Sequence, residues 1–176
     1  DLLELVNDML DLSKIEAGQF EFEYERVDFR KFISVPADGF LMRCKEKNIK
    51  FTYEIEDDIP KYVIVDRQKI RLILNNIIGN AYKFTANKGN ISLSISRKND
   101  DLIMKVSDNG VGIPKKELSN IFKRFNQVEN VMQKKHKGSG LGLAIVKKII
   151  DKVGGKIDVE SDINHGTRFV ITLPVS

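Results

Sequence analysis

The sequence is short of cysteine and of long apolar runs, and both shortages narrow the class of protein. One cysteine, Cys44, stands among 176 residues, so no internal disulfide can form, which is typical of a reducing compartment. No second cysteine or ordered Cys/His pair accompanies it, so we expect a buried structural thiol rather than a reactive one. No apolar run approaches membrane-spanning length, and no signal peptide is visible.

The sequence also lacks internal repeats, low-complexity tracts and a strong excess of one charge. An apolar content of 41% is enough for a sizeable core, which excludes a disordered chain. The formal net charge is +4, and a solvated surface of mixed sign accounts for most of it. One local basic excess runs from Gln133 to Lys137. With no recognition motif and no aromatic–basic platform, the sequence predicts no nucleic-acid partner.

Residues 1–18 are expected to form a helix that belongs to a larger bundle, with Gly18 as its C-cap. Two neighbouring apolar seams predict burial on more than one side of this helix, and its partners are not in the sequence. The chain opens at Asp1 without an initiator methionine, so we expect a piece excised from a longer protein. The two seams are Leu2, Leu5, Met9 and Leu12, and Leu3, Val6 and Leu10.

Helices and strands are expected to alternate over the rest of the chain. The alternation of Phe20, Phe22 and Tyr24 with glutamates predicts a half-buried strand. The predicted helices cover 28–47, capped by Asp28 and kinked or broken around Pro36, then 66–84, 115–125 and 141–153. The predicted strands cover 50–55, 62–65, 91–97, 102–107, 156–161 and 167–173, with a loop over 126–139. This order predicts an α/β (α+β) two-layer sandwich, with a mixed, mostly antiparallel sheet covered on one face by about three helices.

One acidic, glycine-rich stretch, Asp108 to Pro114, follows the predicted strand at 102–107. The glycines Gly110 and Gly112 permit positive φ or a close approach of the backbone to a ligand. An ionised Asp108 accepts hydrogen bonds only, which suits a flat group with an amino edge. The alternative interpretation is a hairpin turn, because Asn-Gly is a common turn dipeptide.

A polar stripe borders the apolar face of the helix at 66–84. Asn76, Asn80 and Lys83 stand at i, i+4 and i+7, whereas Asn75 points elsewhere. Carboxamide oxygens are hard ligands suited to Mg²⁺, and a lysine one turn later supplies a charge for phosphate. The alternative, which this helix alone favours, is a boundary stripe satisfied by neighbouring backbone.

A glycine cluster, Gly138-Ser139-Gly140-Leu141-Gly142, precedes the last helix. Such an entry leaves backbone N–H groups aimed at an anion, and the preceding lysines raise the local anion density. It is neither a P-loop nor a dinucleotide fingerprint, because the spacing and flanking elements differ. A flexible hinge is the alternative. Taken together, the amino-edge reader, the polar stripe and the glycine cluster are suited to Mg–ATP.

The order of four segments resembles the ATP-binding domain of sensor histidine kinases. These segments are 76–85, 108–114, 122–125 and 138–145, and the match extends from about residue 27 onward. The segment 10–18 resembles the end of the second dimerisation helix of that family. The resemblance therefore implies a dimerisation helix over 1–18, a linker strand over 19–27 and the ATP-binding catalytic domain over 28–176.

The resemblance also implies roles for individual residues. Asp108 binds the adenine amino group, Asn80 ligates Mg²⁺, Asn76 supports the metal and phosphates, and Lys83 contacts phosphate. Residues 126–139 form an ATP lid, which Phe122 and Phe125 tie to the core. The γ-phosphoryl group passes to a histidine on a separate helical domain. The implied ATP-binding set is completed by Gly110, Gly112, Ile113, Phe125, Lys137, Gly138, Ser139, Gly140, Leu141 and Gly142.

Three features depart from the family or limit what the chain does alone. Gln127 stands where many members carry an arginine, which resembles hybrid-type kinases and leaves phosphate contact to Arg124 or Lys134–Lys137. The interruption at Pro36 departs from the usual smooth helix. His136 and His165 lie in the predicted lid and in a hairpin turn, so the acceptor histidine is not expected in this chain.

Rival functions within the superfamily remain. ATP hydrolases such as DNA gyrase and heat-shock chaperones place a glutamate at the position of Asn76 as a general base, so steady hydrolysis is not expected here. A serine kinase or a degenerate ATP-sensing module is the alternative. The resemblance implies a homodimeric kinase with a response regulator as partner. It also implies that this domain is cytoplasmic, and it leaves open whether the full protein is anchored in a membrane.

Overall fold

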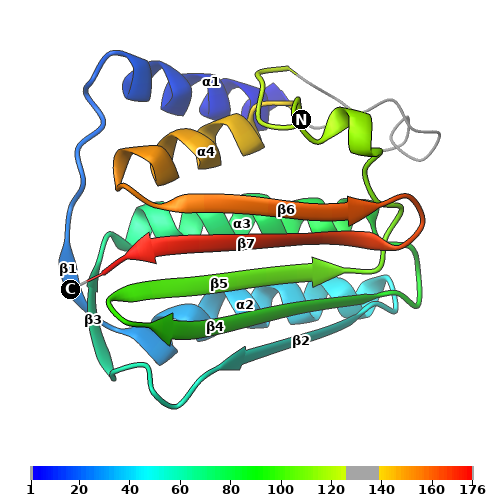
Figure 1. Ribbon diagram of the computed structural model, residues 1–176, viewed down its shortest axis with the longest axis horizontal. Coiled ribbons are helices and arrows are strands. Elements are labelled where there is room, and N and C mark those ends of the chain that lie inside the picture. Colours follow the sequence, from blue (N-terminus) through cyan, green and yellow to red (C-terminus); the bar gives the residue numbers. More distant parts are fainter. Residues whose placement is uncertain (1, 126–138, 176) are drawn as a thin grey trace.

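The computed structural model describes residues 2–125 and 139–175, which form two layers (Figure 1). One layer is a five-stranded sheet in the order β2-β4-β5-β7-β6. Strands β2 and β4 are parallel, and the other neighbours are antiparallel, which confirms the predicted mixed, mostly antiparallel sheet. The strands are β2 (Lys50–Ile55), β4 (Asn90–Lys98), β5 (Asp101–Asp108), β6 (Lys156–Asp162) and β7 (Gly166–Pro174).

The second layer consists of helices on one face of this sheet, as predicted (Figure 1). They are α2 (Phe29–Glu46), α3 (Arg67–Phe84) and α4 (Gly142–Lys152). A small antiparallel pair, β1 (Glu25–Asp28) and β3 (Tyr62–Val65), joins the layers at one end. No helix among residues 2–125 and 139–175 is both long and apolar enough to cross a bilayer.

The core forms where period-2 strands meet period-3.6 helices. On β4, Ile91, Leu93 and Ile95 are buried and alternate with serines, so every second side chain faces the helices. The predicted apolar arc of α3 is buried except at its last residue, Phe84, which is half-buried; the buried members are Ile70, Ile73, Leu74, Ile77 and Ala81. Asp66 begins this helix as predicted, because its side chain accepts a hydrogen bond from the N–H of Lys69 at 3.0 Å. Cap and apolar arc together fix the rotation of α3, and with it the direction of its polar stripe.

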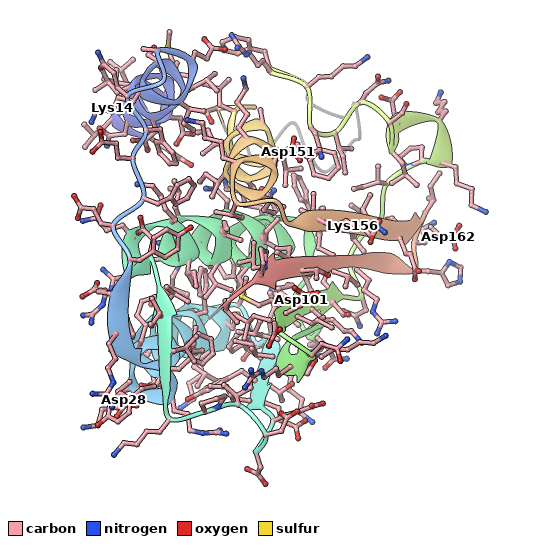
Figure 2. The ribbon with its side chains drawn as sticks, turned by 60° about the vertical axis from the view of Figure 1, so that its left-hand side comes forward. Lys14, Asp28, Asp101, Asp151, Lys156 and Asp162 are labelled. Carbon is pink, nitrogen blue, oxygen red and sulfur yellow. The ribbon has the colours of Figure 1, made fainter. Side chains whose placement is uncertain are left out.

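Helix α1 (Leu2–Glu16) lies against α4, outside the two layers (Figure 1). In Figure 2, Lys14 on α1 and Asp151 on α4 mark the two neighbouring helices, away from Asp28 at the start of α2. Leu12 and Ile15 are buried, and Gly18, at φ +69°, lies past the helix end as the predicted C-cap. Leu5 is half-buried against the core, and the other apolar side chains of α1 are exposed: Leu2, Leu3, Val6, Met9 and Leu10.

We expected a kink or a break at Pro36, and helix α2 is not broken there. The helix runs from Phe29 to Glu46 with the proline inside it. A proline in a helix interior removes one hydrogen bond and costs about 3 kcal/mol. Phe32, Ile33, Ala37 and Phe40 are buried on both sides of it, and this burial offsets the cost.

The half-buried strand expected at Phe20 to Tyr24 does not form. These residues precede β1 and pair with no strand in the described part of the chain. Their rings do share one side, because Phe22 lies 5.7 Å from Phe20 and 5.9 Å from Tyr24 between ring centroids. The N–H of Glu23 donates to Asp66 Oδ2 at 2.9 Å, so a side chain takes the place of a neighbouring strand.

The helix expected over 115–125 is reduced to one 3-10 turn, η1 (Lys115–Glu117), followed by turns. Ile121 is buried and Phe122 packs against the core, so two apolar anchors hold this segment without a regular helix. The predicted loop at 126–139 lies outside the described residues apart from Ser139.

Candidate functional site

Asp108 ends β5 with its carboxylate held from one side. Its Oδ1 accepts hydrogen bonds from the N–H groups of Gly110 at 2.9 Å and Thr167 at 3.3 Å. No residue in the described part of the chain bonds to Oδ2, so that oxygen can accept from a ligand. Burial raises the pKa of Asp108, and the two backbone hydrogen bonds oppose this shift. Burial removes water from Oδ2, and an amino group of a ligand is suited to donate a hydrogen bond to this oxygen in place of water.

The loop after Asp108 is shaped by contacts with the protein's own backbone. A Cβ on Gly110 would lie 2.3 Å from the carbonyl oxygen of Phe84, and Val111 donates to the same oxygen at 3.2 Å. Gly112 has a φ of +73°, and a Cβ there would lie 1.9 Å from the carbonyl oxygen of Asp162. Both glycines are therefore required for packing, and their contact with a nucleotide stays a prediction.

Ile113 closes this loop against the β6–β7 hairpin. Its N–H donates to Ser161 Oγ at 2.7 Å, and its side chain is partly buried against the core. The predicted apolar wall is thus held at the end of the sheet where Asp108 lies.

The two asparagines of the α3 stripe, Asn76 and Asn80, differ in their surroundings. Asn76 Nδ2 donates to the carbonyl of Leu72 at 2.9 Å, and a Cβ on Gly142 would lie 2.4 Å from Asn76 Oδ1. Asn76 therefore spans α3 and the first residue of α4. Asn80 is half-buried, and within the described residues its carboxamide has no hydrogen-bond partner. Asn75 is exposed, as expected.

The described part of the glycine cluster, Ser139 to Gly142, leads into α4. Leu141 precedes Gly142 as the N-cap, and no side chain caps the helix, so its first N–H groups remain suited to an anion. Ser139 Oγ accepts from the N–H of Leu141 at 3.2 Å. The Leu141 side chain is fully buried, so only its backbone can meet a ligand. Lys137 and Gly138 lie outside the described residues.

Phe125 does not pack as expected. Its ring is 61% exposed and its φ is +55°, whereas Phe122 packs against the core. The N–H of Phe125 donates to the carbonyl of Gly140 at 2.9 Å, so backbone rather than ring connects this segment to the start of α4.

Carboxylates of α1 contact this site, which the sequence analysis did not predict. Glu4 Oε1 lies 3.7 Å from Lys83 Nζ, and Asp8 accepts a hydrogen bond from Ser139 Oγ. Further along α1, Glu16 pairs with Arg124 and lies 3.5 Å from Lys148 Nζ. The spacing of Glu4 and Asp8 at i, i+4 places them on one helix face, but no local pattern indicates what that face meets.

The donors present fit a magnesium ion held jointly with phosphate. Asn80 offers a hard carboxamide oxygen, and Mg²⁺ commonly takes only one or two protein oxygens. Residues 2–125 and 139–175 hold no group of three His, Cys, Asp or Glu side chains that could bind a metal. A magnesium ion bound here would depend on Asn80 and on the phosphates of a ligand.

The chain matches known proteins over most of its length. Residues 65–176 match the family described as histidine kinase-, DNA gyrase B- and HSP90-like ATPase. Sensor histidine kinase WalK of Bacillus subtilis is 38% identical over 175 residues, which are 98% of this chain and 28% of that protein. Histidine-protein kinase BarA of Escherichia coli K12 is 33% identical over 174 residues, 96% of this chain and 19% of that protein. The chain thus spans less than a third of the length of these relatives.

Solved structures share the fold. Full-length ShkA, solved with AMPPNP, superimposes with a TM-score of 0.88 at 30% identity, over 99% of this chain and 36% of that one. Histidine kinase ThkA, solved with response regulator TrrA, gives 0.74 at 26% identity over 99% of this chain and 49% of that one. The family match and these relatives show that the chain belongs to the histidine kinase-, DNA gyrase B- and HSP90-like ATPase family, and its relatives are sensor histidine kinases.

Proposed function

We propose that this chain binds Mg–ATP and donates the γ-phosphoryl group to a histidine on a separate helical domain, as the catalytic domain of a hybrid-type sensor histidine kinase. The one-sided bonding of Asp108 carries the proposal, because Oδ1 is fixed by two backbone N–H groups and Oδ2 is left to accept from the adenine amino group. Relatives of this chain are named sensor and hybrid histidine kinases, and ShkA was solved with an ATP analogue.

Each end of the nucleotide has a group suited to it. Asp108 accepts from the adenine edge, with Ile113 as an apolar wall beside it. Lys83 and the N–H groups at the start of α4 attract the phosphates. Asn80 is the proposed protein ligand of Mg²⁺, which when bound neutralises phosphate charge. The chain's part in transfer is therefore to hold and orient the γ-phosphoryl group.

Hydrolysis is a weaker candidate because the site offers no base on α3. The position of the hydrolase glutamate is Asn76, a carboxamide without basicity. Its amide donates to Leu72 and its oxygen faces Gly142, so it is already used in positioning α4.

The acceptor histidine, a second subunit and a response regulator are proposed partners outside this chain. His165 is exposed in the β6–β7 hairpin and bonds its own turn through Nδ1 to Ile163 O at 3.0 Å, which does not suit an acceptor. We place the acceptor on helices that cover the exposed seam of α1, and we place this domain in the cytoplasm.

Calorimetric titration of ATP, with and without Mg²⁺, tests the proposal. Wild-type protein is expected to bind ATP with an affinity that Mg²⁺ alters, and Asp108→Asn is expected to lose at least about 10-fold, since a hydrogen bond to a charged group is worth about 1.5–3 kcal/mol. Asn80→Ala should lose the effect of Mg²⁺ while retaining adenosine binding. Absence of ATP binding by the wild-type chain would favour a degenerate module.

A further inference from the structure

Ser161, at the end of β6, has a hydroxyl whose hydrogen bonds are all assigned within the protein. It lies in the β6–β7 hairpin, whose tip is marked by Asp162 in Figure 2. Its Oγ accepts from the N–H of Ile113 at 2.7 Å, donates to the carbonyl of Gly166 at 2.8 Å, and lies 2.9 Å from Thr167 Oγ1. One side chain thus joins the loop after β5 to both strands of the hairpin.

The proton count fixes the direction of these bonds. A serine hydroxyl has one proton and two acceptor sites. Because that proton goes to Gly166, the contact with Thr167 requires the threonine hydroxyl to donate to Ser161. Thr167 then has only lone pairs left on Oγ1, while its backbone N–H donates to Asp108.

The side chains of Asp108 and Thr167, which lie beside each other at this end of the sheet, therefore offer only hydrogen-bond acceptors to a ligand. Asp108 and Thr167 are partners in the β5–β7 register. Asp108 contributes Oδ2, and Thr167 contributes a hydroxyl whose proton is held by Ser161. An acceptor-only edge favours a purine with an amino group at C6 and disfavours one with a carbonyl there.

We propose that Ser161 is a positioning residue that sets purine discrimination, through the Thr167 proton it holds and the Ile113 loop it anchors. The inference rests on the proposed function, because it requires a nucleotide at Asp108. The loop and the hairpin also meet at a second point, since a Cβ on Gly112 would lie 1.9 Å from the carbonyl oxygen of Asp162. Ser161 is therefore one of two contacts that hold the loop to the hairpin, and what it adds beyond packing is the hydrogen-bond polarity of the site.

The test compares ATP with inosine triphosphate, which carries a carbonyl at C6. In Ser161→Ala the Thr167 proton is released and can be donated to that carbonyl. ATP affinity should fall roughly 5-fold, about the value of one hydrogen bond, and the ratio of ATP to inosine triphosphate affinity should fall by more, about 10-fold. Ser161→Thr keeps a hydroxyl and should keep the ratio. Ser96→Ala, which changes a half-buried serine on β4 at the other end of the sheet, should change neither affinity.

Each outcome decides between this role and a structural one. If Ser161→Ala weakens both nucleotides equally, with the wild-type ratio preserved, Ser161 is only structural and the inference is overturned. Ser161→Cys, which keeps a weaker donor and acceptor, replaces the alanine variant if that variant does not fold, and its ratio should then lie between. Failure of the wild-type protein to bind ATP would remove the proposed function and this inference together, whereas ATP binding with an unmoved ratio removes the inference alone.

Discussion

The ammonium nitrogen of Lys83 on α3 lies 3.7 Å from the carboxylate oxygen Oε1 of Glu4 on α1. One helical turn later, Asp8 accepts a hydrogen bond from Ser139, just before α4. Burial raises the pKa of Asp8, and the bond from Ser139 opposes that shift. Helix α1 thus presents carboxylates to two groups that we propose for the phosphates of ATP. Lys83 and Glu4 are partly exposed, at 30% and 50%, so the pair is worth no more than about 1 kcal/mol.

Removing these two carboxylates should tighten ATP binding. In Glu4→Gln/Asp8→Asn, Lys83 and Ser139 no longer face negative groups, and we expect a gain of about 2- to 5-fold in ATP affinity, larger at low salt. Calorimetry measures the change, with adenosine as a ligand that lacks phosphate and should be unaffected. Asp11→Asn is the matched variant on the same helix. Equal gains for ATP and adenosine would contradict the electrostatic explanation.

Asp108→Asn should lose ATP but gain stability at neutral pH. Burial raises the pKa of Asp108 above the ordinary 3.8. At a pH between 3.8, the pKa in the unfolded chain, and the raised pKa in the folded protein, the folded state binds more protons than the unfolded state. The free energy of unfolding therefore falls as pH rises through this window and stays lowered above it. Asparagine does not ionise, so the variant does not lose this stability. Urea unfolding should therefore show a stability advantage for the variant at pH 7.

The same advantage should shrink as the pH falls through the raised pKa toward 3.8. ATP affinity of the wild type should also fall over this window, because a protonated Asp108 no longer offers an ionised acceptor. The stability prediction fails if the difference between variant and wild type is independent of pH.

Two glycines with the same backbone conformation should respond differently to alanine. Gly112 has a φ of +73° and Gly154 a φ of +74°, but a Cβ meets the carbonyl of Asp162 at 1.9 Å only in the first case and nothing within 4 Å in the second. Gly154→Ala should cost about 1–2 kcal/mol from backbone strain alone. Gly112→Ala should cost clearly more and weaken ATP binding as well. Thermal and urea unfolding measure the stability costs of the two substitutions. Equal costs would show that the loop rearranges to accommodate the Cβ at position 112.

Gly142 and Asn76 should be energetically coupled. A Cβ on Gly142 would lie 2.4 Å from Asn76 Oδ1, so Gly142→Ala should cost about 1–3 kcal/mol of stability through overpacking. In an Asn76→Ala background the obstacle is gone, and alanine gains about 0.5–1 kcal/mol over glycine in a helix. The same substitution should therefore become neutral or stabilising. A double-mutant cycle from urea unfolding measures the coupling, and additive costs would show that a Cβ at position 142 does not press against Asn76.

Elements that depend only on local apolar period and on helix caps could be predicted from the sequence. The Asp66 cap and the apolar arc from Ile70 to Ala81 predicted α3, and the alternation around Leu93 predicted β4, because each pattern needs only neighbours within a few residues. The layer order, the mostly antiparallel sheet and the position of Asp108 at a strand end followed from these elements. Motif order then indicated the family.

Contacts between residues far apart in the chain could not be predicted from the sequence and are known only from the folded structure. Helix α2 passes through Pro36 because burial outweighs a local cost, and Glu23 bonds to Asp66, 43 residues away, instead of to a strand. Ile113 finds Ser161 across 48 residues, and Ser139 finds Asp8 across 131. A single hydroxyl or carboxylate has no periodicity, so its partner is set only when the packed helices and strands bring two distant segments together.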